Sequence, residues 1–70
     1  MIERAVSLTI ERESELVRAT STRQPKAWGA LAAKGVLTFR ELAGRAPTDT
    51  ERRALWSGLW RATEQASVRD

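Results

Sequence analysis

The chain has 70 residues, a formal net charge of +3 and neither cysteine nor histidine. A chain of this length forms at most one small domain with a modest hydrophobic core, and without thiols or imidazoles it forms no disulfide and none of the usual zinc or iron sites. We therefore expect a single domain over residues 1–70 with no metal and no cofactor. Because small domains need a further source of stability, we also expect a homodimer.

The N-terminal region shows no export or membrane signal. Residues 1–21 include four glutamates and no apolar run. The apolar stretches elsewhere are far shorter than the roughly 20 residues that span a bilayer. We expect no membrane-spanning segment and a soluble, cytoplasmic protein.

Positive charge is concentrated in the second part of the chain. Residues 1–22 carry three arginines and four glutamates, whereas residues 23–70 carry nine basic and five acidic residues. Ten of the twelve basic residues are arginine, whose planar guanidinium suits bidentate contacts with phosphate. The composition indicates either a nucleic-acid surface or a coding bias towards arginine, and both interpretations stay open at this point.

The first predicted element has two interpretations. Val6, Leu8 and Ile10 alternate with polar residues, which is typical of a strand over residues 5–11. Good helix formers follow, and we favour a single helix over residues 3–19. Its apolar face would consist of Ile2, Val6, Ile10 and Val17. A helix here would be a dimerisation element or a fourth packing helix, whereas a strand would need a partner strand from a second copy.

A polar linker over residues 21–24 precedes the second predicted helix, which runs from Pro25 to Lys34. Proline suits the first turn of a helix, because its missing N–H needs no partner there. Gly35 stands where a left-handed residue ends many helices. The predicted buried stripe of this helix consists of Trp28, Leu31 and Ala32.

A third helix is predicted over residues 39–45. Thr38 and Glu41 have the spacing of a capping box, in which a hydroxyl and a carboxylate each accept an N–H at the start of a helix. Leu37 and Leu42 have the positions of a hydrophobic staple, an apolar contact across the start of a helix. Gly44 and Pro47 are residue types that end helices.

The last predicted helix covers about residues 49–66. Thr48 and Glu51 repeat the capping-box spacing at its start. Trp56 and Trp60 lie one turn apart on the flank of its apolar face, where they either close the core or bind a partner. The inner face itself consists of Leu55, Leu59, Ala62, Thr63 and Ala66.

We expect no enzymatic activity. The chain has no histidine, cysteine or tyrosine for acid–base or nucleophilic chemistry, and its four glycines match no phosphate-binding loop. Glu11, Glu13 and Glu15 are close in sequence, but on a helix Glu13 points away from the other two. Such a cluster is typical of a solvated helix face.

The stretch over residues 30–65 is similar to helix-turn-helix and winged-helix DNA-binding regulators. The similarity rests on Leu31, the phrase GVLTFRELA from Gly35 to Ala43, the phrase RRAL from Arg52 to Leu55, and Leu59. The chain differs from this family in a turn about two residues longer. Pro47 replaces the usual glycine of that turn, and no wing follows.

From the predicted helices we expect an all-α fold, a small bundle of three or four helices whose helical core covers residues 25–66. The resemblance implies that this core is helix-turn-helix-like. It also implies a small DNA-binding regulator, in which the LTFRELA segment positions the helix after Pro47 for reading DNA. The candidate DNA contacts, with arginines on the phosphates, are Arg45, Thr48, Thr50, Arg52, Arg53 and Ser57.

A protein–protein interaction module, such as an adaptor or an inhibitor of a larger assembly, is the alternative hypothesis. Its candidate binding residues are Trp56 and Trp60. The DNA hypothesis predicts an affinity for duplex DNA that falls steeply with salt. The protein hypothesis predicts that Trp60 is exposed in the free chain.

Overall fold

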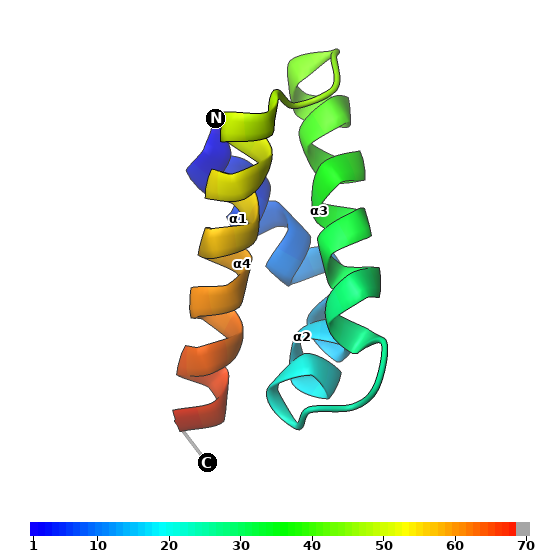
Figure 1. The fold of residues 1–70 in the computed structure, drawn as a ribbon, viewed down its shortest axis with the longest axis vertical. Helices are drawn as coiled ribbons and strands as arrows, with labels where there is room; N and C mark the ends of the chain where they lie inside the picture. The colour runs from blue at the N-terminus through cyan, green and yellow to red at the C-terminus, as the bar shows by residue number, and fades with distance from the viewer. Residues whose placement is uncertain (69–70) are drawn as a thin grey trace.

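The computed structural model describes residues 1–68, and the side chains of residues 1–65. Over this range the chain forms four helices and no strand: α1 (Ile2–Arg12), α2 (Ser14–Ser21), α3 (Ala27–Ala43) and α4 (Asp49–Val68). Each helix contacts the other three. In Figure 1, α3 and α4 run in opposite directions along the long axis of the molecule. The predicted all-α bundle is confirmed, and the alternative strand over residues 5–11 is wrong.

The N-terminal segment is bent rather than straight. The predicted single helix over residues 3–19 is wrong, because Glu13 leaves helical geometry (φ −117°, ψ 43°) and separates α1 from α2. Backbone hydrogen bonds continue across the bend: the Glu13 N–H donates to the Thr9 carbonyl, and the Val17 N–H donates to the Glu13 carbonyl. The bend lets each helix bury its own face. The buried residues of the two helices are Ala5, Thr9, Val17 and Thr20.

Helix α3 is continuous where two helices were predicted. Gly35 does not cap a helix but lies buried inside α3, where an added Cβ would come within 2.7 Å of Leu59 Cδ1. The hydroxyl of Thr38 donates to the Lys34 carbonyl at 2.9 Å, so the predicted capping box with Glu41 does not form. The predicted cap fails because burial against α4 favours an unbroken helix. Leu37, expected to staple a helix start, is 51% exposed.

The connection between α3 and α4 follows the prediction closely. Gly44 ends α3 in the left-handed conformation (φ 73°), and its N–H donates to the Arg40 carbonyl at 2.9 Å. The capping box at the start of α4 is confirmed. The Thr48 N–H donates to Glu51 Oε1 at 2.9 Å, and the Glu51 N–H donates to Thr48 Oγ1 at 3.2 Å.

The core lies between α1, α3 and α4. Its fully buried residues are Ala5, Thr9, Leu31, Phe39, Leu55 and Leu59. Of the inner face predicted for the last helix, Leu55, Leu59 and Thr63 are buried and Ala62 is half-buried, while the side chain of Ala66 lies outside the described residues. Trp28 belongs to the edge of the core, where its ring meets that of Trp60 edge-on at 5.2 Å.

The loop between α2 and α3 contains two non-glycine residues with positive φ, Arg23 (61°) and Lys26 (68°). Arg23 occupies the left-handed position of a Schellman motif, since its N–H donates to the Thr20 carbonyl and the Gln24 N–H donates to the Ala19 carbonyl. Pro25 precedes the helix instead of starting it, because Lys26 occupies the left-handed N-cap of α3.

Alanine substitutions at two glycines of α3 test the close contact between α3 and α4. We expect Gly29→Ala, with nothing within 4 Å of its new Cβ, to raise the free energy of unfolding by about 0.5–1 kcal/mol. We expect Gly35→Ala to lower it by about 1 kcal/mol, because fully buried Leu59 must shift. Urea denaturation measures both, and an equal gain at the two sites would contradict the close contact.

A glycine at position 23 should relieve strain in the α2–α3 loop. We expect Arg23→Gly to raise the free energy of unfolding by about 0.5–1 kcal/mol, because glycine adopts positive φ without steric cost. Gln24→Gly is the control and should lower it, since Gln24 is not at positive φ and glycine only adds freedom to the unfolded chain. Thermal unfolding of the two variants compares them.

Candidate functional site

The six predicted DNA contacts are all exposed but do not form one patch. Thr50, Arg53 and Ser57 recur at spacings of three and four residues and therefore share the outward face of α4. Arg45 lies in the α3–α4 loop, and Thr48 is occupied in the capping box. Arg52 lies on the flank of α4 that faces α3, beside Trp56.

Arg45 is held by an acid of its own chain. Its guanidinium makes a bidentate pair with Glu51 at 2.7 and 2.8 Å, donates to the Ala46 carbonyl at 3.1 Å and lies 5.4 Å from the centre of the Phe39 ring. The hydrogen bond from Arg45, followed by that from the Thr48 N–H, lowers the pKa of Glu51 from 4.5 to about 2. The pair fastens the α3–α4 loop to the first turn of α4.

Arg52 and Trp56 form a second unit. Arg52 Nη2 lies 2.6 Å from Asp49 Oδ1, and its guanidinium lies 5.4 Å from the centre of the Trp56 ring. The indole N–H of Trp56 donates to the Ala32 carbonyl at 3.3 Å. Arg52 therefore pairs with Asp49, while Glu41 pairs with Arg12. Trp56 is half-buried and is held by the hydrogen bond to Ala32 and by the guanidinium beside its ring.

An apolar depression of about 450 Å³ lies between α3 and α4, and we call it the α3–α4 groove. Its lining residues are Ala33, Val36, Leu37, Ala46, Pro47, Arg52 and Trp56. An adjoining depression of about 430 Å³ shares Leu37 and Ala46 with it and adds Arg40, Glu41, Gly44 and Arg45. Together they form a continuous surface with apolar residues, three arginines and one glutamate.

Leu37 is the functional candidate that sequence reasoning missed. It was assigned to a helix start, whereas it is a half-exposed leucine at the junction of the two depressions. The signal was the run of apolar and small residues at positions 33, 36 and 37, which the predicted helix boundary at Gly35 obscured. Trp56, predicted to bind a partner, does line this groove.

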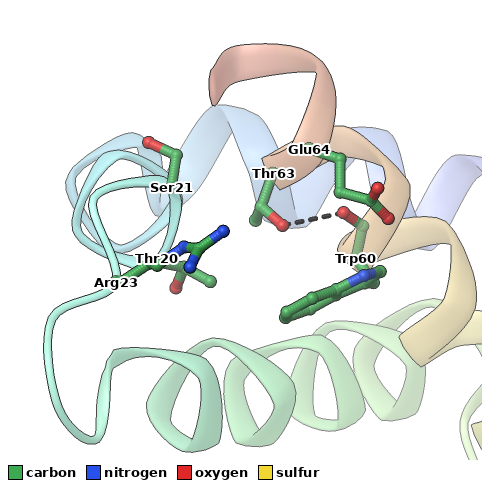
Figure 2. Close-up of a pocket in the computed structure, with 6 residues that line it drawn as sticks. All are labelled: Thr20, Ser21, Arg23, Trp60, Thr63 and Glu64. Atoms are coloured by element: carbon green, nitrogen blue, oxygen red, sulfur yellow. Dashed lines mark hydrogen bonds between the residues drawn. The ribbon is translucent and has the colours of Figure 1, made fainter. Parts of the chain in front are cut away.

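Trp60 lies in a separate small pocket between the ends of α2 and α4 (Figure 2). Trp60 is 48% exposed, and the Thr63 hydroxyl donates to the Trp60 carbonyl at 2.7 Å. Arg23 points towards the pocket from the α2–α3 loop (Figure 2). The volume of about 90 Å³ holds only about three water molecules. The pocket therefore has room for water or one small group.

Among the described residues, no three acidic side chains come together as a possible metal site. None of the helices within this range combines the length and the apolar character needed to cross a membrane. No protein-family model matches the chain, and neither a curated protein nor a solved structure matches it.

Loss of the Glu51 carboxylate should change how stability depends on pH. The pKa of Glu51 is lower in the folded chain, so its contribution is present above pH 4.5 and is lost as pH falls towards 2. We expect Glu51→Gln to be less stable than the wild type at pH 7 and to lose less stability between these two pH values. Glu41→Gln is the control and should keep the acid-dependent loss caused by Glu51. Urea midpoints measured along the pH range compare the three chains.

Proposed function

We propose that this chain is a non-enzymatic protein-binding module whose interface is the α3–α4 groove. The observation that carries the proposal is the exposure of Leu37, 51% of whose surface is open to solvent beside an apolar groove. Contiguous exposed apolar surface on a small chain is typical of a site that another molecule covers. An adaptor or an inhibitor of a larger assembly would use such a surface.

Trp56 has the properties of an anchor in a protein interface. Its ring is fixed by the hydrogen bond to the Ala32 carbonyl and by the guanidinium of Arg52. A side chain that is already ordered loses little entropy when a partner binds, and tryptophan and arginine are the residues that most often dominate binding energy. Trp56 and Leu37 therefore form the centre of the proposed interface.

The arginines around the groove define the chemistry of the partner. Arg52 is held by Asp49, whose side chain is 80% exposed, and an exposed pair of this kind contributes little free energy. Arg40 is exposed and takes part in none of the ion pairs among the described residues. We infer that the partner presents apolar side chains flanked by carboxylates, which would pair with Arg40 and Arg52.

Duplex DNA is the second candidate partner. The helix-turn-helix-like core is proposed only together with DNA binding. It is supported by the excess of basic residues after position 22 and by Arg53, which is exposed on the outward face of α4 together with Thr50 and Ser57. The bidentate pair of Arg45 with Glu51 favours it less, because phosphate would have to displace the carboxylate that already binds this guanidinium.

Site-specific photo-cross-linking tests the proposal. We expect a photoreactive amino acid at position 37 to cross-link a distinct protein in the cells that naturally express the chain, and the same group at exposed Glu11 not to do so. Trp56→Ala should reduce the yield at position 37 at least about tenfold, because truncation of a buried anchor costs 2 kcal/mol or more.

Binding of a labelled DNA duplex by the same chain decides between the two candidates. The proposal predicts no duplex affinity at physiological salt. A salt-sensitive affinity that is lost in Arg52→Ala/Arg53→Ala, with no cross-linked protein at position 37, would establish the DNA function instead.

A further inference from the structure

A second groove lies on the opposite flank of α4, between α4 and α1. Its volume is about 810 Å³, and we call it the α1–α4 groove. At its centre Val6 packs against Gly58, where an added Cβ would come within 2.8 Å of Val6 Cγ2. Val6 therefore already fills the space beside Gly58, and the small side chains that α4 leaves open to a partner in this groove are Ala54 and Ser57, both exposed.

The two charged residues of this groove have opposite signs and lie on opposite sides of the central contact. Glu3 precedes Val6 by three residues on α1, and Arg61 follows Gly58 by three residues on α4. Because α1 and α4 start at the same end of the molecule (Figure 1), the two charges are separated along the groove by about 9 Å. Neither takes part in an ion pair among the described residues.

We propose that the α1–α4 groove binds a second copy of this chain about a two-fold axis that passes near the Val6–Gly58 contact. A two-fold axis brings the same surface of both copies together in opposite directions. Glu3 of each copy then faces Arg61 of the other, and the pair forms twice. Ala54 and Ser57 of each α4, which line the groove with the Val6–Gly58 contact, pack against the other copy.

The pattern of charges is what selects a second copy as the occupant here. In the α1–α4 groove the two-fold axis places Glu3 of one copy opposite Arg61 of the other. Self-association therefore brings unlike charges together. In the α3–α4 groove and the depression beside it, Arg45 and Arg52 are already paired with Glu51 and Asp49, and Glu41 is paired with Arg12. A second copy there would gain no comparable exchange of unlike charges.

The two grooves can be occupied at the same time. Trp56 in one and Gly58 in the other differ by about 200° around the axis of α4, so they face in nearly opposite directions. The dimer is therefore independent of the proposed protein partner. Only nine residues line the α1–α4 groove in each copy, which is fewer than a standard interface has. We expect a weak dimer with a Kd on the order of 10–100 µM.

Charge exchange between the two positions tests the dimer. Sedimentation equilibrium of the full chain should show a monomer–dimer equilibrium in this concentration range. Glu3→Arg alone and Arg61→Glu alone should each weaken the dimer roughly tenfold, because each replaces two attractive pairs with two repulsive ones. The double variant Glu3→Arg/Arg61→Glu should restore the wild-type Kd. Leu37→Ser should leave the Kd unchanged, because Leu37 lies in the other groove.

Three results would overturn the inference. These are a chain that stays monomeric up to about 1 mM, single charge variants that dimerise like the wild type, and a dimer that Leu37→Ser dissociates. Circular dichroism and thermal unfolding of each variant establish that it is folded before its Kd is compared. Loss of the dimer would leave the cross-linking result at position 37 unaffected, so the two proposals fail separately.

Discussion

The close contact between α3 and α4 at Gly35 is the constraint on which the rest of the structure depends. Without a side chain at this position, Leu59 and Leu55 pack directly against the backbone of α3. Phe39, one turn further along α3, is buried in the same core cluster. A larger residue at position 35 would push the two helices apart. The walls of the α3–α4 groove are the helices α3 and α4, so the contact at Gly35 sets the distance between them.

Helix α4 supports both proposed interfaces, and it does so with different residues on its two flanks. The flank towards α3 carries Trp56 and Arg52, which are large and held in place. The flank towards α1 carries Gly58, against which Val6 packs, and the exposed small side chains of Ala54 and Ser57, which would let a second copy come close. One helix can therefore present an anchored aromatic surface to one partner and a close-packing surface to another, while its buried face holds the bundle together.

The sequence predicted those parts of the fold whose causes are local. The capping box of Thr48 and Glu51 forms because every group it needs lies within four residues, after a loop that begins where Gly44 ends α3. The same spacing at Thr38 predicted a helix start that does not exist. There the hydroxyl bonds within the helix instead, to the Lys34 carbonyl, and the helix continues because Gly35 is needed against α4. A glycine that allows close packing and a glycine that ends a helix are identical in sequence.

The candidate site was predicted only in part for the same reason. Trp56 was recognised from its place on the flank of a helical face, which periodicity alone determines. Leu37 was missed because its exposure depends on how α3 meets α4. Arg45 was assigned to phosphate, but the path of the loop brings it to Glu51, six residues away. Whether an arginine is available to a partner depends on tertiary contacts that the sequence does not display.

Through the Arg45–Glu51 pair, the shape of the α3–α4 groove also depends on whether the first turn of α4 stays folded. Ala46 and Pro47, which line the groove, lie between the two residues of the pair, and Glu51 belongs to the first turn of α4. Fraying of that turn would release the loop and remove one wall of the groove. The backbone amides at the start of α4 should therefore exchange with solvent more slowly when the groove is occupied, even where they touch no partner atom. Their protection is a measure of binding that needs no label on the partner.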